Sequence, residues 1–318
     1  MQLLRDLIPD DQLLPPEVVP ARPGRFVEMA GSLAHVLDFP ATSSQADPAL
    51  FLPGLAIPAL SWTDLGELLR PHFDIQALDI PGFGRSRNAD GHSVATHVNF
   101  VAQWIEHSGR GPVHLFGNSL GGLISLRVAV SRPDLVRSLT LISPAMPCLN
   151  GENHHWYVLA CVMPRMKALL RRRIGRLATA DAEEMLRAAL ARHCVNPALV
   201  PPRRIAEGAE EMLRCVGTTE FPDALLQTLR SAALTLTRSY IPGAGSLWRL
   251  ARRVNVPTLI LWGQLDKTFP VSLGTKLAEA IPGSWLHIIE NVGHIPHVES
   301  PRVVARAVLA MRSIAALP

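Results

Sequence analysis

The hydrophobic and polar positions of the chain follow two periods, and the changes between them mark the predicted elements. Alternating apolar residues predict a β-hairpin, with strands at residues 25–30 and 33–39 around Gly31-Ser32. Beyond a polar loop at residues 41–48, short apolar runs predict strands, and longer runs with apolar residues at helical spacing predict helices. These strands are expected at residues 50–52, 73–78, 113–116 and 136–142, and the helices at 62–70, 94–106 and 120–130. Alternating strands and helices indicate βαβ units in a mostly parallel sheet.

The alternation stops at about residue 145, and the sequence is helical in character up to about residue 253. It then resumes, with predicted strands at residues 258–262 and 285–289 and predicted helices at 273–280 and 302–314. A long helical block between two sheet strands predicts an inserted cap, or lid, domain. We therefore expect an α/β core domain at residues 25–144 and 254–318 and a cap at residues 145–253. A proline-rich arm at residues 1–24 is expected either to lie over the body or to be partly disordered.

The composition is that of a globular protein, with 318 residues of which 48% are hydrophobic and 18% charged. The net charge is +4, and the densest basic run is Arg171-Arg172-Arg173. A solvated helix face explains this run, and the alternative is a surface that attracts an acidic substrate or makes weak contact with anionic lipid at a membrane. The sequence lacks the broad basic stripe with interleaved aromatic residues that is typical of nucleic-acid binding, so no nucleic-acid partner is expected.

The sequence also bears on compartment and cofactors. Its first residues lack a secretory signal pattern, and no run approaches the roughly 20 apolar residues of a membrane span. We therefore expect a cytoplasmic protein without a transmembrane segment. The four cysteines have no metal-ligand spacing and are expected to be free thiols; they are Cys148, Cys161, Cys194 and Cys215. No metal and no organic cofactor is indicated, and no pattern indicates an oligomeric state.

The strongest local signal is Gly117-Asn118-Ser119-Leu120-Gly121, which follows an apolar strand and opens an apolar helix. This strand–turn–helix context is the one in which G-x-S-x-G forms a nucleophile elbow. The turn is tight, so its flanking positions, Gly117 and Gly121, must be small. It presents the Ser119 hydroxyl at a helix N-terminus, which favours a developing oxyanion. Ser119 is therefore the candidate nucleophile, and the alternative is a glycine-rich turn with an incidental serine.

A serine hydroxyl needs a base to become a nucleophile, and the base needs a group that orients it. Asp266 follows the predicted strand at residues 258–262, and His294 follows the one at 285–289, so both fall at the sheet edge where ligand sites gather. The order serine, acid, histidine is the order of folds that carry such an elbow. His294 is preferred to His297 as the base because it directly follows Gly293, which lets the backbone turn. His297 is expected to support the loop.

With these residues in place, the chain resembles the α/β-hydrolase superfamily, in the branch with a helical cap after the sixth sheet strand. The resemblance covers about residues 25–314 and rests on four ordered motifs. They are the elbow, the loop Asp79-Ile80-Pro81-Gly82-Phe83-Gly84-Arg85-Ser86, the acid motif Gly263-Gln264-Leu265-Asp266, and Gly293-His294 with Glu299 and Pro301. The resemblance implies an α/β-hydrolase fold, with a mostly parallel twisted sheet flanked by helices. It also implies structural roles for Asp79 and Gly82.

The chain departs from the family pattern after the third sheet strand. The family usually carries His-Gly there, whereas this sequence has Pro53-Gly54. Gly54 preserves the turn, so the backbone N–H of Leu55 is expected to form an oxyanion hole with that of Leu120. Proline cannot supply the side-chain hydrogen bonds of the usual histidine.

The resemblance also implies a reaction. Cap-bearing relatives that open epoxides or remove halide use an aspartate at the elbow, so Ser119 argues against both activities. It implies instead hydrolysis of a small, apolar carboxylic ester or thioester. Carbon–carbon bond hydrolysis of dienoic ring-cleavage products is also open, since enzymes of that kind often share the elbow Gly117–Gly122. Ile295 and Thr63 depart from the residues usual in those enzymes. Acyl transfer, cofactor-free perhydrolysis and a non-catalytic binding role on the same fold stay open as well.

Overall fold

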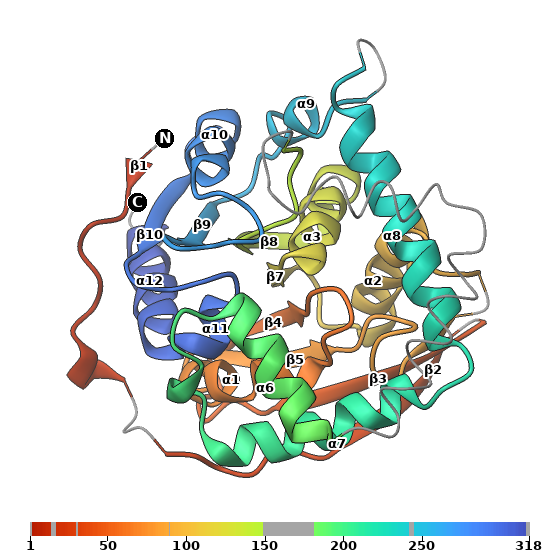
Figure 1. Cartoon of the computed structure of the whole chain (residues 1–318). Helices are drawn as coiled ribbons and strands as arrows, with labels where there is room; N and C mark the ends of the chain where they lie inside the picture. The colour runs from red at the N-terminus through yellow and green to blue at the C-terminus, as the bar shows by residue number, and fades with distance from the viewer. Residues whose placement is uncertain are drawn as a thin grey trace.

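The computed structural model describes residues 2–13, 17–29, 31–88, 90–148, 181–241 and 245–315. Within these ranges, ten strands form one sheet in the order β1-β10-β9-β8-β7-β4-β5-β3-β2, with β6 beside β3 (Figure 1). The strands are β1 Gln2–Leu3, β2 Gly24–Met29, β3 Ser32–Phe39, β4 Asp47–Leu52, β5 Phe73–Leu78, β6 Arg87–Asn88, β7 Val113–Asn118, β8 Val136–Ile142, β9 Thr258–Gly263 and β10 Trp285–Ile289. The central strands pair in parallel, whereas β3 is antiparallel to both β2 and β5. The predicted α/β class, with its mostly parallel sheet, is confirmed.

Helices cover both faces of the sheet, and the side chains of β4 point alternately to the two helical layers. Leu50 and Leu52 pack in one apolar cluster with residues of α2, α3, α9 and α10. Ala49 and Phe51 pack in the other cluster, with residues of α1 and α12. The helices of the two layers are α1 Thr63–Leu69, α2 Val94–Ser108, α3 Leu120–Ser131, α9 Leu247–Ala251, α10 Ser272–Ala280 and α12 Pro301–Ala315. The sheet is therefore buried on both faces, which explains why its central strands are continuous apolar runs.

The ends of the strands decide which side chains reach the edge of the sheet. The structure extends β7 through Gly117 and Asn118, because both residues pair with β8. The next residue, Ser119, therefore leaves the sheet at the carboxyl end of a central strand. At its other end, β4 begins at Asp47 instead of residue 50, because its backbone pairs with β5 from there. The apolar pattern could not report this extension, since it begins with the polar Asp47 and a proline.

The N-terminal arm contributes to the fold in a way that the sequence did not indicate. Its first residues form β1, an edge strand that pairs in parallel with β10. Arg302 of α12 holds Asp10 through a bidentate contact, with a shortest distance of 2.8 Å. Further along the arm, the carbonyl oxygen of Val19 accepts a hydrogen bond from Arg204 at 2.7 Å. The described part of the arm thus bridges the sheet edge and a helix of the predicted cap.

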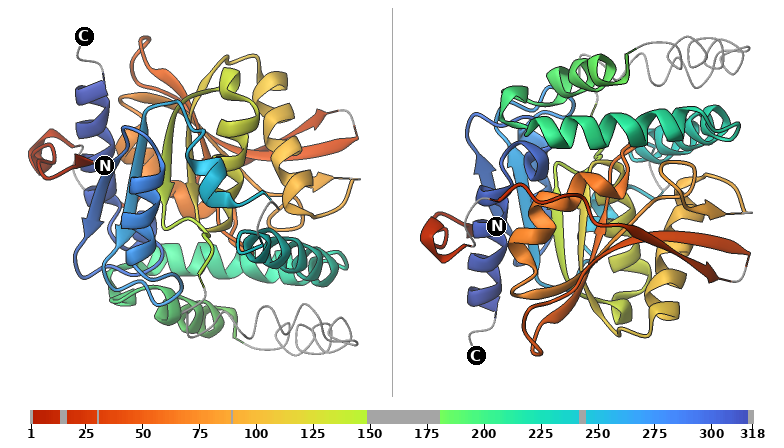
Figure 2. Two further views of the ribbon diagram at one scale, coloured as in Figure 1. Left: turned by 90° about the horizontal axis from the view of Figure 1, so that it is seen from above. Right: turned by 90° about the horizontal axis from the view of Figure 1, so that it is seen from below.

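The described residues of the predicted cap are helical. They include α6 Ala182–His193, η4 Pro197–Leu199, α7 Pro202–Val216 and α8 Phe221–Arg238, and the three α-helices lie along one side of the molecule (Figure 2). Two ion pairs join α7 to the core: Arg204 with Asp64 at 2.8 Å, and Arg85 with Glu211 at 2.5 Å. Although burial alone raises it, the hydrogen bonds from Arg85 hold the pKa of Glu211 below its ordinary value. The domain division at 145–253 remains a prediction.

Two sequence predictions concern a possible contact with a membrane. The basic run Arg171-Arg172-Arg173, predicted as a solvated face or a weak membrane contact, lies outside the described residues. Among the helices that the structure does describe, none is long and apolar enough to cross a membrane.

Candidate active site

The nucleophile elbow is a strained turn between β7 and α3. Ser119 has φ 52° and ψ −115°, a left-handed conformation that side chains other than glycine rarely adopt. Its N–H donates to the carbonyl of Ile142 at 3.1 Å, and its carbonyl accepts from the N–H of Ala145 at 2.9 Å. These hydrogen bonds connect Ser119 to the end of β8 and hold its backbone in the strained conformation. Strain of this kind is typical of a functional turn.

Close backbone contacts explain the glycines of the elbow. A Cβ atom on Gly121 would lie 2.5 Å from the carbonyl oxygen of Pro53, in the loop after β4. A Cβ atom on Gly117 would lie 2.5 Å from the carbonyl carbon of Gly121. Any side chain at these positions would force the backbone apart. The elbow therefore requires small residues because backbone segments lie close to both glycines.

The predicted acid and base meet at the edge of the sheet. Asp266 lies in the loop after β9, and its Oδ2 is 2.8 Å from Nδ1 of His294, in the loop after β10. The Asp266 side chain is fully buried and the His294 side chain is 4% exposed. Oδ1 of Asp266 accepts the N–H groups of Thr268 at 2.8 Å and Phe269 at 3.0 Å. Because the carboxylate can only accept, the proton of a neutral His294 belongs on Nδ1, and Nε2 is left with a free lone pair.

The competing histidine has a different environment. His297 is fully buried and stacks on Trp62, with ring centroids 4.2 Å apart. Neither of its ring nitrogens has a hydrogen-bond partner within the described part of the chain. Burial, together with the nearby His294, lowers the pKa of His297 to about 3. His297 is therefore a neutral packing residue, and it is His294 that the structure pairs with Asp266.

Asn118 joins the elbow to the loop that carries His294. Its Nδ2 donates to the carbonyl of Ile142 at 3.0 Å and to the carbonyl of His294 at 3.2 Å. The side chain is completely buried. The residue directly before Ser119 thus fixes the backbone of the histidine. The sequence assigned Asn118 no role of its own, because only the fold brings it beside residue 294.

The loop after β4 lies against the elbow, where the oxyanion hole is predicted. A Cβ atom on Gly54 would lie 3.4 Å from Cβ of Ser119 and 3.2 Å from Oδ1 of Asn118. The same loop holds Ala56 at φ 57°, a second residue in the left-handed region. Leu55 is partly exposed beside it. The roles of the Leu55 and Leu120 N–H groups as oxyanion donors remain predictions.

Asp79 holds the end of the loop after β4 in place. Its buried carboxylate accepts the N–H of Ala59 at 2.7 Å and the N–H of Arg85 at 3.0 Å, and it lies 2.7 Å from Nδ1 of His35. Its own loop needs glycine: Gly82 has φ +87°, and Gly84 has φ +107° and no room for a Cβ beside the carboxylate. Asp79 therefore connects the turn after β5 to the end of the predicted oxyanion loop.

One residue of the predicted cap touches the site although no sequence motif marks it. The carbonyl oxygen of His193, at the end of α6, accepts the N–H of His294 at 2.6 Å. The two imidazole rings lie 5.6 Å apart, and burial together with His294 lowers the pKa of His193 to about 4. This contact adds a second reason for Gly293. A side chain there would overlap the His193 carbonyl.

Other groups of the described chain show no sign of separate chemistry. Cys148, Cys194 and Cys215 are free, as predicted, and Cys161 lies outside the described residues. Burial raises the pKa of Cys194 and of Cys215 to about 12, so neither thiol ionises readily. Within the described ranges, no group of three or more potential ligand side chains is placed to hold a metal ion.

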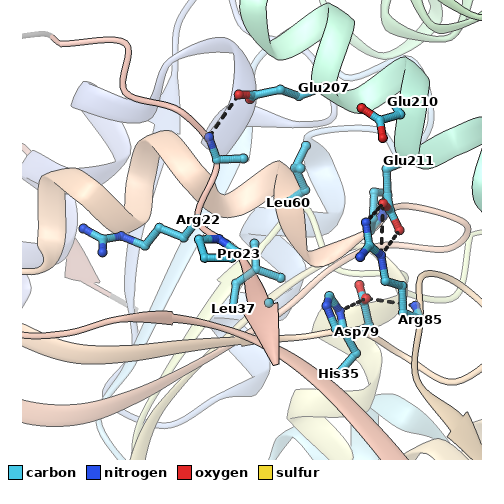
Figure 3. Close-up of a pocket in the computed structure, with 13 residues that line it drawn as sticks. Arg22, Pro23, His35, Leu37, Leu60, Asp79, Arg85, Glu207, Glu210 and Glu211 are labelled. Atoms are coloured by element: carbon cyan, nitrogen blue, oxygen red, sulfur yellow. Dashed lines mark hydrogen bonds and ion pairs between the residues drawn. The ribbon is translucent and has the colours of Figure 1, made fainter. Parts of the chain in front are cut away.

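A pocket of about 220 Å³ lies away from the elbow, between the N-terminal arm, β3 and α7 (Figure 3). It contains the His35–Asp79 and Arg85–Glu211 pairs, which the close-up shows facing one another. Its lining includes no residue of the elbow or of the Asp266 and His294 loops. The side chains of each pair already contact one another, so the pocket is a polar junction between arm, core and cap helix.

Comparison with known proteins identifies the class that this fold and site define. A family model of the alpha/beta hydrolase fold matches residues 47–301. The match covers most of the chain, and the chain therefore belongs to the α/β-hydrolase family.

Individual relatives are more distant. Monoacylglycerol lipase abhd6-A of Xenopus laevis is 27% identical over 272 residues, covering 81% of this chain and 72% of the relative. Haloalkane dehalogenase 2 of Mycobacterium tuberculosis (strain ATCC 25618 / H37Rv) is 26% identical over 326 residues, covering 96% of this chain and 98% of the relative. Among solved structures, a putative lipase (lip1) from Acinetobacter baumannii AYE superposes with a TM-score of 0.70 at 21% identity, covering 92% and 93% of the two chains. These likenesses support an α/β-hydrolase enzyme.

Proposed function

We propose that the protein is a serine hydrolase that cleaves a carboxylic ester or thioester through an acyl-enzyme on Ser119. The observation that carries the proposal is the buried contact of 2.8 Å between Asp266 Oδ2 and His294 Nδ1, in a loop whose His294 carbonyl accepts a hydrogen bond from Asn118, the residue directly before the strained Ser119. In the proposal, Asp266 orients His294, and His294 Nε2 acts as the general base.

The proposed reaction has two halves. Ser119 Oγ attacks the carbonyl carbon and gives its proton to His294 Nε2, and the resulting oxyanion is stabilised by the N–H groups of Leu55 and Leu120. The carbon–oxygen or carbon–sulfur bond then breaks, and His294 returns the proton to the leaving alcohol or thiol. In the second half, water attacks the acyl-enzyme and gives a proton to His294. Collapse releases the carboxylic acid and restores the Ser119 hydroxyl.

An apolar acyl group is favoured by the side chains around the elbow. The Ile57 side chain packs against Gly54, in the loop beside Ser119. The Phe269 ring lies 5.7 Å from the ring of His294. Relatives named as lipases are consistent with such a substrate. One relative is named a haloalkane dehalogenase, but we do not propose dehalogenation for this chain. The resemblance assigns alkyl-enzyme chemistry to an aspartate at the elbow, and this chain has Ser119 there.

The proposal is tested by turnover of p-nitrophenyl esters of graded chain length, beside a dienoic diketo acid. The wild-type protein should hydrolyse the esters, and Ser119→Ala should lose this activity. Ser131→Ala is the matched control, because Ser131 lies at the far end of the same helix and its hydroxyl only binds carbonyls of the preceding turn. Ester turnover that survives in Ser119→Ala would refute the proposal. A strong preference for the diketo acid would replace it with carbon–carbon bond hydrolysis.

A further inference from the structure

Glu299 lies at the junction of the predicted cap and the loop that carries the proposed base. Its Oε2 accepts the N–H of Gly293 at 2.8 Å. Its Oε1 accepts the N–H groups of Val195 and Asn196, each at 2.7 Å. The residue is only 4% exposed. One carboxylate therefore binds the backbone on both sides of the junction.

His193 makes the second connection across the same junction. Its carbonyl, which the end of α6 leaves without a helical partner, accepts the N–H of His294 at 2.6 Å. Its ring contacts the other loop, because Nδ1 lies 3.2 Å from Oγ1 of Thr268. The N–H of Thr268 in turn donates to Asp266. His193 thus touches the loop of the proposed base and the loop of its acid.

The burial of Glu299 makes these contacts depend on one another. No salt bridge to Glu299 is found within the described part of the chain, and its two carboxylate oxygens accept three backbone N–H groups. A buried carboxylate that loses hydrogen bonds retains its full desolvation cost. If residues 195–196 moved away, two of the three donors would be lost. The position of this cap segment and the position of the Gly293-His294 backbone are therefore linked.

We infer that residues 193–196 and Glu299 form a clamp that positions His294, so that the predicted cap supplies part of the scaffold of the catalytic base. His193 and Glu299 are positioning residues in this inference, and neither takes part in proton transfer. The inference rests on the proposed function, because it assigns the clamp to a histidine that acts as base. It has a structural consequence of its own: the cap is fixed to the core at the end of α6, and this end moves together with the histidine loop.

Glu299→Gln tests the clamp, because glutamine keeps the shape but offers one acceptor oxygen in place of two. Hydrogen exchange should become faster at residues 193–196 and at 293–294 together, while α3 stays protected. In ester turnover, kcat should fall by about 10²-fold, the usual effect of misplacing a catalytic group by about 1 Å, while KM changes less than about twofold. Glu290→Gln is the control, since Glu290 is exposed in the same loop.

A pair of variants at His193 keeps the test decisive if Glu299→Gln fails to fold. His193→Phe keeps a ring but loses the contact with Thr268, and kcat should fall. His193→Asn places a polar atom near the position of Nδ1 and should restore most of the wild-type kcat. The inference is overturned if exchange quickens only at 193–196 and kcat is unchanged, or if phenylalanine and asparagine behave alike. Exchange needs no substrate, so coupled exchange in a protein without esterase activity would reject the proposed function and leave the structural link intact.

Discussion

Replacing Asp266 with asparagine reverses one hydrogen bond of the site while leaving the others in place. Oδ1 of Asp266 accepts the N–H groups of Thr268 and Phe269, and the amide oxygen of asparagine can keep both contacts. The amide NH₂ is then directed at Nδ1 of His294, where Oδ2 now lies at 2.8 Å. Two donors cannot face one another, so the imidazole must adopt the other tautomer, with its proton on Nε2. In that form His294 cannot accept the proton of Ser119.

The expected loss in kcat for Asp266→Asn is about 10⁴-fold, the effect of the wrong tautomer in a serine triad. It corresponds to about 5.5 kcal/mol in the activation free energy, at about 1.36 kcal/mol for each factor of ten. The assay is turnover of a p-nitrophenyl ester at a mildly alkaline pH, with Asp11→Asn as a control because Asp11 is exposed. The circular dichroism spectrum should match the wild type. A folded Asp266→Asn protein that keeps most of its kcat would refute the assigned role of Asp266.

Gly121→Ala should destabilise the protein by about 3 kcal/mol in urea unfolding, because the added Cβ meets backbone; an unchanged midpoint would contradict the described turn. Asn118→Ala should lower kcat about tenfold, as the loss of one orienting hydrogen bond to the His294 carbonyl costs about 1–2 kcal/mol, and equal activity would exclude a positioning role. His297→Phe should keep the stacking on Trp62 and flatten the pH dependence of stability. Burial lowers the pKa of His297 to about 3, so between that pH and about 6.5 the unfolded state binds a proton that the folded state does not, and stability falls as the pH falls. The variant should remove up to about 1.4 kcal/mol per pH unit of this decrease in the free energy of unfolding. The measurement is the urea midpoint of both proteins at neutral and mildly acidic pH. An equal decrease in the wild type and the variant would contradict the assignment.

The sequence indicated the parts of the site that depend on local order along the chain. Ser119, Asp266 and His294 each follow a buried strand, and parallel strands bring their carboxyl ends to one edge. The strands at 73–78, 136–142 and 285–289 were predicted with the ends that the structure has. These features depend on residues that are adjacent in sequence, and hydrophobic periodicity is a reliable signal over such short ranges.

The features that escaped prediction depend on contacts between distant residues. His193 is 101 residues before His294 (294 minus 193) and carries no motif; only the packing of α6 on the histidine loop brings them together. The edge strand β1 comprises two exposed residues, whose place is set by pairing with Trp285 and Leu286. The close contact at Gly293 escaped for the same cause, since the sequence could not reveal the His193 carbonyl beside it.

Covalent labelling with a fluorophosphonate probe, followed by mass mapping of the modified peptide, tests the central claim most directly. We expect one adduct on Ser119 in the wild-type protein, no adduct in Ser119→Ala, and much slower labelling in His294→Ala, because the hydroxyl then lacks its base. His297→Phe should be labelled at the wild-type rate. An unlabelled wild-type protein, or a labelling rate that is the same in His294→Ala, would contradict the assignment of Ser119 as an activated nucleophile.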